Sequence, residues 1–298
     1  MANIARHILV PTDFSQASNQ ALEVARQIAA RLSAEIHLLH VRILLEDPHV
    51  LEEGQRQLEG LLTRSDQKTR QALSTATTAQ AGVVMHPHLV RGLSAPESII
   101  QAGLDIGCDL IVMGTHGRRG LKRFFLGSVT EQVIRTSPVP VVTVRPGTPP
   151  GTLAGGRILV PFDFSHAAHA ILPAVADWAK AFEAGIRLLH VVEPIIYPEF
   201  YAVDLMPGDM IDTICKRAEE NLRQLAKDNL PGLNVSTDVM TGHAAETLAK
   251  EAVPERSSFV IMPTRGLSTL EHLLLGSVAQ YVVRHATVPV LTVRPGQE

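Results

Sequence analysis

The sequence lacks several features that would place it in a special class of protein. Its 298 residues contain only two cysteines, Cys108 and Cys215, which excludes a disulfide framework and a four-cysteine metal site. No run of about 18 apolar residues occurs, which excludes a membrane-spanning helix. The 27 Lys and Arg residues nearly balance the 30 Asp and Glu residues, and the net charge of −3 gives no overall field suited to nucleic acid.

The beginning of the chain shows no charged leader followed by an apolar stretch, so we expect no export signal. Together with the few cysteines, this favours a reducing, cytoplasmic setting without a membrane or a nucleic acid as partner. Apolar residues make up 45% and charged residues 19% of the chain, which is typical of a globular protein with a buried core.

The chain contains one sequence pattern twice. Residues 8–15 read ILVPTDFS, and residues 158–165 read ILVPFDFS. The string TVRP at residues 143–146 returns at residues 292–295. A repeat unit of about 150 residues buries its own core, so the pattern indicates a duplicated domain and not a solenoid.

A segment rich in proline and glycine separates the two copies. Residues 146–156 contain three Pro and four Gly, a composition that ends strands and does not sustain a helix. We therefore predict a first domain over residues 1–146, a linker over 147–156 and a second domain over 157–298.

Strands and helices are predicted to alternate within each copy. Apolar runs such as residues 7–11 and 109–114 are typical of buried parallel strands. Residues 21–32 carry apolar side chains three and four positions apart, which predicts a helix with one buried face. The fold class is therefore α/β, with two tandem, five-stranded, mostly parallel sheets of Rossmann-like type covered by helices.

Ligands of open parallel sheets bind beyond the carboxyl ends of the strands, so the loops at that edge carry the functional hypotheses. The loop after the first strand reads PTDFS at residues 11–15 and PFDFS at residues 161–165. Asp13 accepts hydrogen bonds from a ribose or an adenine in one interpretation and caps the next helix in the other. From Asp13 alone, capping is the interpretation that we prefer.

The loop after the fourth strand contains glycines in a regular spacing. Gly114 and Gly117 are followed by nine residues and then by Gly127 and Ser128, where a helix is expected to begin. Backbone amides at a helix start bind anions, glycine permits close approach of phosphate, and Ser128 can cap the helix. Between the glycines lie four cations: Arg118, Arg119, Lys122 and Arg123. The alternative is a set of turns with a solvated basic loop.

On these motifs the sequence resembles the universal stress protein family, specifically its tandem, two-domain members, over nearly the whole chain. Residues 114–128 match every fixed position of the family's ATP-type signature: Gly, two residues, Gly, nine residues, Gly, then Ser or Thr. The opening HILVPTDFS and the ending VPVVTVRP are similar as well. The resemblance implies an adenine nucleotide alpha-hydrolase-like fold, ATP with Mg²⁺ as the ligand, and a role as a nucleotide-dependent regulator of the stress response.

The resemblance also implies which residues bind the nucleotide. Asp13 and the backbone of Val41 would hold the nucleoside, and the glycine loop would surround the ribose and phosphates. The implied residues of the first domain are Pro11, Thr12, Asp13, Val41, Met113, Gly114, Gly117, Arg118, Gly127, Ser128 and Val129. Those of the second domain are Asp163, Val191, Gly266, Gly276 and Ser277.

The second copy departs from the signature. Pro263 replaces the first glycine, and proline removes an amide donor. The four cations are replaced by Leu267, Ser268, Glu271 and His272. We therefore predict that the first domain is the principal ATP site and that the second binds weakly, binds a less charged nucleotide or stays empty.

No catalytic residue is predicted. The P-loop string is absent, and His116, the best candidate for a base, is replaced by Arg265 in the second copy. We favour a binding regulator. A slow ATP hydrolase or nucleotidyl-transfer enzyme and a nucleotide-independent, chaperone-like scaffold are the alternatives.

The remaining histidines and the final strands complete the predictions. His86 and His88 share one side of a strand, either as a metal pair or, as we prefer, as an exposed edge. His40 and its counterpart His190 are expected to satisfy hydrogen bonds in the core. The strands at residues 139–144 and 288–293 are expected to pair into an internal pseudo-dimer, while association of two chains stays open.

Overall fold

A computed structural model shows how the repeated sequence folds. It describes residues 4–43, 55–78, 82–117, 126–149, 153, 155–193, 208–266 and 275–294. Within these ranges, the side chains of residues 55–65, 78, 208 and 209 are not described. The proline- and aromatic-rich stretch at residues 194–201 is expected from the sequence to pack over a helix, with a lid or a subunit contact as the alternatives, and it lies outside the described residues.

The first half of the chain alternates strands with helices, as predicted. Its elements are β1 (His7–Pro11), α1 (Gln16–Leu32), β2 (Glu35–Ile43), α2 (Gln55–Thr78), β3 (Met85–Gly92), α3 (Ala95–Ile106), β4 (Leu110–Gly114), α4 (Ser128–Thr136) and β5 (Val141–Val144).

The second half repeats this order with one helix divided. Its elements are β6 (Arg157–Pro161), α5 (His166–Ala170), α6 (Leu172–Phe182), β7 (Gly185–Val192), α7 (Gly208–Asn229), β8 (Val235–Thr241), α8 (Ala244–Glu251), β9 (Phe259–Pro263), α9 (Ser277–His285) and β10 (Val290–Val293).

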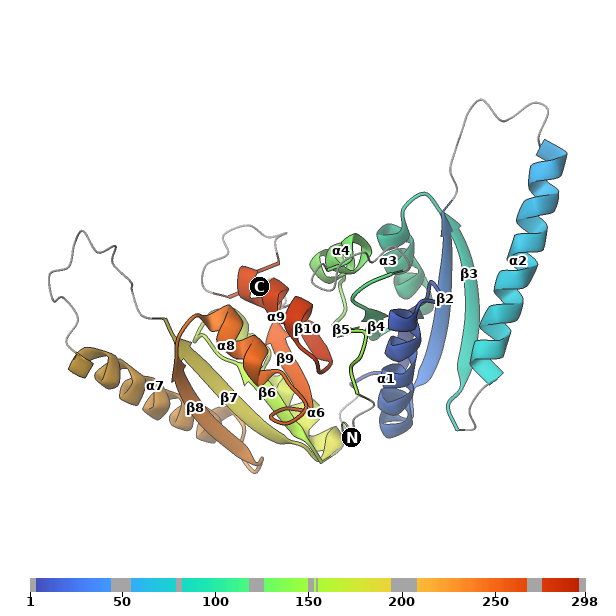
Figure 1. Cartoon of the computed structure of the whole chain (residues 1–298). Coiled ribbons are helices and arrows are strands. Elements are labelled where there is room, and N and C mark those ends of the chain that lie inside the picture. The colour runs from blue at the N-terminus through green and yellow to red at the C-terminus, as the bar shows by residue number, and fades with distance from the viewer. Residues whose placement is uncertain are drawn as a thin grey trace, which may run out of the picture.

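All described strands form one ten-stranded sheet in the order β3-β2-β1-β4-β5-β10-β9-β6-β7-β8. Neighbours within each half are parallel, whereas β5 and β10 pair antiparallel in the middle. The predicted pairing of the two final strands is therefore confirmed. Figure 1 shows the halves side by side, with α2 and α7 at opposite ends of the molecule.

The β5–β10 junction joins the two halves through both backbone and side chains. The hydroxyl of Thr143 donates to the carbonyl oxygen of Val290 at 3.2 Å. The hydroxyl of Thr292 donates in return to the carbonyl oxygen of Val141 at 3.1 Å. Apart from these two threonines, every residue of β5 and β10 is apolar, and both strands are almost wholly buried. Two sheet edges that would otherwise be exposed are thus removed together.

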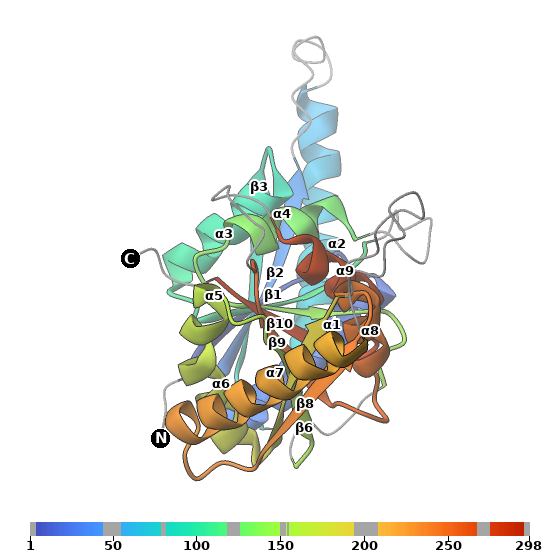
Figure 2. The ribbon, with the colours of Figure 1, turned by 90° about the vertical axis from the view of Figure 1, so that its left-hand side faces the viewer.

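Helices cover both faces of the sheet, so alternate strand residues enter two apolar layers. Ile8 and Val10 point into the layer beneath α1, and Leu9 points into the layer beneath α3 and α4. Each of these side chains is fully buried, which contributes about 1.5–3 kcal/mol apiece to folding. In Figure 2 the second half faces the viewer, and α7 lies in front of its strands.

Local sequence explains where α1 begins and ends. The Ser15 hydroxyl accepts a hydrogen bond from the amide of Ser18 and caps the first turn. Ser33 closes the helix in the left-handed conformation at φ 56°.

The counterpart of α1 in the second half is interrupted. The α5 helix ends at Ala170, Ile171 turns the chain, and α6 carries Pro173 in its first turn. Proline offers no amide donor to the preceding turn and its ring crowds that turn, which disfavours a regular helix through this position. Glu23 stands at the equivalent point of α1 and keeps that helix whole.

None of the helices in the described part of the chain combines the length and the apolar character that a membrane crossing requires.

Candidate functional site

A cavity of about 820 Å³ lies at the carboxyl ends of β1, β2 and β4 in the first half. The starts of α3 and α4 complete its walls. Every predicted binding residue of this half that the structure describes lines the cavity: Pro11, Thr12, Asp13, Val41, Met113, Gly114, Gly117, Gly127, Ser128 and Val129. Arg118 lies outside the described residues, together with Arg119, Lys122 and Arg123.

The turn between β1 and α1 is held by its own polar side chains. The hydroxyl of Thr12 accepts from the amide of Phe14 at 3.0 Å. One carboxylate oxygen of Asp13, Oδ1, accepts from the amide of Ser15 at 3.0 Å. Phe14 adopts a left-handed φ of 62° between them. Because Ser15 is the residue that caps α1, the capping interpretation of Asp13 is wrong.

At two glycines of the loop, neighbouring protein atoms leave no room for a Cβ. A Cβ on Gly117 would lie 2.9 Å from Oδ2 of Asp13, so glycine lets the carboxylate pass beneath the loop. A Cβ on Gly114 would lie 2.8 Å from the carbonyl carbon of Ala17, so glycine lets α1 pack directly on β4. The close approach that glycine permits here is to Asp13 and to α1.

The start of α4 faces the cavity without a side-chain cap. Gly127 is the N-cap residue, and no side chain of the described residues bonds to the first amides of the helix. Ser128 is the first helical residue, so the prediction that it caps the helix is wrong. Thr130 donates its hydroxyl to the carbonyl oxygen of Gly114 at 2.8 Å and ties the helix to the end of β4. Amides in this position form a binding site for an anion.

Two histidines belong to the wall of this cavity. His40 Nδ1 donates to the carbonyl oxygen of Thr12 at 2.7 Å, and its ring centroid lies 5.0 Å from that of Phe14. The predicted hydrogen bond of His40 is confirmed, and His190 makes the same bond to Phe162 at 2.7 Å. The sequence did not predict that His40 lines the cavity. The recurrence of this histidine in both copies was the signal that could have indicated it.

His116 also lines the cavity and has one polar atom without a hydrogen bond. Its Nδ1 lies 2.8 Å from the hydroxyl of Thr115, whereas its Nε2 is buried and has no partner among the described residues. Burial, with a smaller contribution from Arg145, lowers the pKa of His116 below its ordinary value. Burial therefore favours the neutral form of this imidazole.

The rest of the wall is mainly apolar, and the sequence analysis did not assign it. These residues come from β2, from α3 and from the loop before α4: Leu39, Ile43, Ala95, Ile99 and Leu126. An apolar wall opposite a few convergent polar groups is typical of a site for a small organic molecule with a charged end.

The equivalent cavity in the second half measures only about 180 Å³. All five predicted residues line it: Asp163, Val191, Gly266, Gly276 and Ser277. Asp163 Oδ1 again accepts from the amide of Ser165 at 3.0 Å, so the turn is the same. The halves thus share the backbone of the site and differ in the space that it encloses.

Three substitutions account for much of this difference. Phe162 stands where the first half has Thr12, is only 2% exposed and packs edge-on against Phe164. Pro263 stands in place of Gly114, and Arg265 in place of His116. Bulkier side chains therefore occupy the walls of the second cavity.

Comparison with known proteins agrees with this architecture. The family model described as "Universal stress protein family" matches residues 5–145 and again residues 156–294. Universal stress protein MJ0531 of Methanocaldococcus jannaschii is 32% identical over 143 residues, covering 48% of this chain and 84% of that protein. Universal stress protein Slr1230 of Synechocystis is 24% identical and covers 97% of this chain and 100% of its own length.

A solved structure shows the same fold over both halves. A universal stress protein from Archaeoglobus fulgidus superposes with a TM-score of 0.60 at 24% identity, covering 98% of this chain and 97% of that one. The predicted α/β class with two tandem domains of mostly parallel strands is confirmed, and the β5–β10 pairing joins the two predicted sheets into one. From the two family matches and this shared fold we conclude that the chain belongs to the universal stress protein family and carries two copies of its domain in tandem.

Proposed function

We propose that the first half of the chain binds ATP and that its occupancy regulates the protein in a cytoplasmic stress response. The observation that carries this proposal is the uncapped start of α4 at one end of the 820 Å³ cavity, with the Asp13 carboxylate beside it. Small organic ligands occupy protein cavities of about 300–1,000 Å³, so the volume suits a nucleotide.

In this proposal, each part of the nucleotide contacts a different part of the cavity wall. The amides of Ser128 and Val129 would bind phosphate oxygens, because the helix start is positively polarised and uncapped. Asp13 would accept hydrogen bonds from the ribose hydroxyls. Apolar side chains such as Ile99 would cover the adenine, and the backbone of Val41 would bind its edge.

The residues around the phosphate end fit a nucleotide that carries Mg²⁺. Magnesium prefers oxygen ligands, keeps several waters and is usually bound through substrate phosphates with one or two protein oxygens. The hydroxyl of Ser128 is an oxygen of this kind within the cavity wall. When bound, the ion would neutralise phosphate charge, and the protein residues would orient the complex.

The second half is proposed to bind ATP weakly or not at all. Its cavity of about 180 Å³ lies below the range for small organic ligands, and Phe162 is buried in its wall. Pro263 also lacks the amide that Gly114 offers in the first half. The β5–β10 pairing would then hold one active and one inactive copy together as an internal pseudo-dimer.

Slow ATP hydrolysis is the second candidate function, and His116 is the observation that favours it. Its imidazole is held neutral by burial and carries a buried Nε2 without a partner among the described residues. A neutral imidazole can accept a proton from an attacking water. If hydrolysis depends on this group, His116→Asn would abolish phosphate release while leaving ATP affinity within about twofold. Equal rates of phosphate release by the unaltered chain and by His116→Asn would reject a role of His116 in hydrolysis.

Calorimetric titration with ATP and Mg²⁺ tests the proposed binding site. We expect one ATP per chain, and we expect Gly117→Ala to weaken binding about tenfold, because the new Cβ displaces the Asp13 carboxylate. Gly266→Ala is the matched control, since it makes the same change beside Asp163 in the smaller cavity. Unchanged thermal stability with and without ATP would instead favour a nucleotide-independent scaffold.

A further inference from the structure

Five polar side chains meet at the amino ends of β1, β2 and β3, at the opposite end of the sheet from the cavity. They are His7, Glu35, His37, His86 and His88. His7 is the register partner of Glu35, and His37 is the partner of His86. Since partners and residues two apart in a strand share a face, all five side chains lie on one face of the sheet.

Three of these residues bring ligand atoms together. Nδ1 of His7 lies 3.2 Å from Nε2 of His37 and 4.0 Å from Oε2 of Glu35. All three atoms lie within 4.8 Å of one another. Two ligand atoms bound tetrahedrally to Zn²⁺, each about 2.1 Å away, are about 3.4 Å apart, so the observed spacing is close to that of a coordinated pair.

The other two histidines lie within hydrogen-bond distance of two of these ligands. Nε2 of His86 lies 3.0 Å from Oε2 of Glu35, and Nε2 of His88 lies 3.1 Å from Nδ1 of His37. Ligating histidines in metalloproteins are usually held by a hydrogen bond at the second ring nitrogen, and ligating carboxylates are held similarly. The cluster therefore has both the ligands and the groups that orient them.

The environment keeps the central imidazole uncharged. His37 is 8% exposed, and burial, followed by the neighbouring His88, His86 and His7, lowers its pKa to about 4. Burial and His86 also lower the pKa of His88. His37 is therefore the most buried residue of the proposed ligand set.

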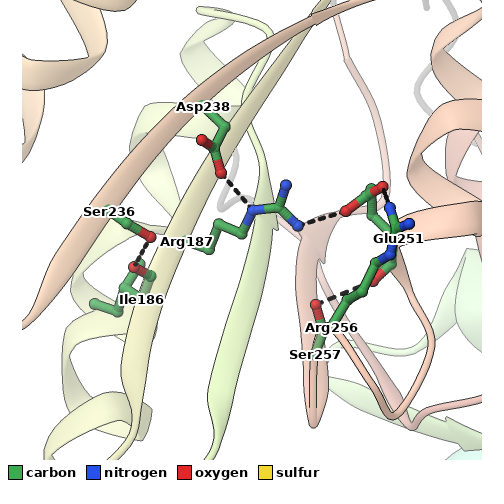
Figure 3. A network of polar contacts seen from close by, with 7 residues as sticks. All are labelled: Ile186, Arg187, Ser236, Asp238, Glu251, Arg256 and Ser257. Carbon is green, nitrogen blue, oxygen red and sulfur yellow. Dashed lines mark hydrogen bonds and ion pairs between the residues drawn. The ribbon is translucent and has the colours of Figure 1, made fainter.

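The second half fills the same place with a fixed cation. Arg187 is the counterpart of His37, and Figure 3 shows its guanidinium between the carboxylates of Asp238 and Glu251. Its Nε donates to Asp238 at 2.5 Å and its Nη1 donates to Glu251 at 2.6 Å. In the first half, the ion-pair contacts described for Glu35 are with His7 and His86, which are cations only when protonated.

We propose that His7, Glu35 and His37 bind one divalent transition-metal ion, Zn²⁺ foremost, with His86 and His88 as positioning residues. Two imidazoles and one carboxylate suit zinc and its neighbours and not calcium or magnesium, which take oxygen ligands. Three protein ligands leave a coordination position for water or a further ligand. The site is independent of the nucleotide cavity, because the two lie at opposite ends of the strands.

Titration of the metal-free full-length chain with Zn²⁺ alone, followed by calorimetry, tests this site. We expect one Zn²⁺ per chain. His88→Ala should weaken binding about 10–100-fold, as is usual when an orienting partner is lost, and Glu35→Gln should weaken it at least as much. His88→Gln should restore most of the affinity, because its amide oxygen can still accept from Nδ1 of His37. Circular dichroism verifies that each variant is folded.

The matched control is His166→Gln, which removes an exposed histidine from α5 in the second half. It should leave zinc affinity unchanged. Co²⁺ in place of Zn²⁺ should give the intense visible absorption of four-coordinate cobalt, lost in Glu35→Gln. The proposal is overturned if no stoichiometric zinc binds, if Glu35→Gln binds as tightly as the unaltered chain, or if His166→Gln is weakened as much as Glu35→Gln.

Discussion

The two halves of the molecule share one fold and differ in what the fold encloses. Asp13 and Asp163 hold identical turns, and Gly117 and Gly266 lie over them in the same way. Yet one cavity measures about 820 Å³ and the other about 180 Å³. A conserved backbone frame therefore does not by itself preserve a binding site, because a few wall side chains such as Phe162 decide the free space.

The two halves also differ at the opposite end of the sheet, where the difference lies in the charged side chains and not in cavity volume. The first half gathers imidazoles and one carboxylate around His37, whereas the second half places an ion-pair network around Arg187. Glu251 pairs with both Arg187 and Arg256 and is only 2% exposed at its side chain. The second half contains the Arg187 cation as part of its own fold, whereas the first half offers the proposed ligands for a metal cation.

The largest expected effect comes from removing that built-in cation. Arg187→Met removes one of the two arginines that pair with the buried carboxylate of Glu251 and should lower the free energy of unfolding by about 3 kcal/mol, the lower end of the cost of breaking a buried ion pair. Glu35→Gln in the metal-free chain removes the carboxylate of the first half's cluster and should cost less than about 1 kcal/mol, because Glu35 is partly exposed. Urea denaturation measures both, and equal losses would contradict the contrast between the halves.

Exchanging a wall residue should close the larger cavity. Thr12→Phe introduces the side chain that the second half carries at this position and should reduce ATP affinity at least about 100-fold, or about 2.7 kcal/mol. Thr12→Ser keeps the hydroxyl that accepts from Phe14 and should bind as the unaltered chain does. Calorimetry measures the affinities, and tight ATP binding by folded Thr12→Phe would show that wall volume does not separate the halves.

A smaller effect is expected from the carboxylates. Asp13→Asn should weaken ATP binding about tenfold, since hydrogen bonds to a charged group contribute about 1.5–3 kcal/mol. Asp163→Asn, the same change in the second half, should leave the measured affinity unaltered. Fluorescence competition with a labelled nucleotide measures both variants. If Asp163→Asn weakened binding as much as Asp13→Asn, both halves would take part in binding.

The smallest effect concerns acid stability of the ligand-free chain. Because the pKa of His116 is lowered on folding, the unfolded chain takes up its proton first as the pH falls below about 6.5. The free energy of unfolding therefore falls as the pH drops below that value, and above it the contribution of the neutral His116 to stability is fully present. His116→Gln should flatten the fall in melting temperature between pH 7 and pH 5. An unchanged slope would show that His116 is as easily protonated in the folded chain as in the unfolded one.

The repeat and the strand pattern were enough to predict the fold. They predicted the alternating elements, the pairing of β5 with β10, and the loops that form the first cavity. The division of the helix after Ala170 was missed, although Pro173 was visible in the sequence. Apolar periodicity continues across this point, so it concealed the interruption that proline causes.

Individual roles in the site were harder to predict, because they depend on contacts between segments. The Asp13 carboxylate suits a cap, but Ser15 two residues later occupies the capping position. The sequence explains Gly114 by the close approach of a phosphate, whereas the packing of Ala17 against β4 already requires a glycine at this position. The histidine cluster combines three strands, and the spacing of His86 and His88 alone could not reveal the partners that strand register brings beside them.

Native mass spectrometry of the full-length chain with increasing ATP and Mg²⁺ tests the central claim most directly. The account predicts a single nucleotide adduct that saturates at one per chain, persists in Asp163→Asn and is lost in Thr12→Phe. Two adducts of equal affinity, or an adduct that persists in folded Thr12→Phe, would contradict it.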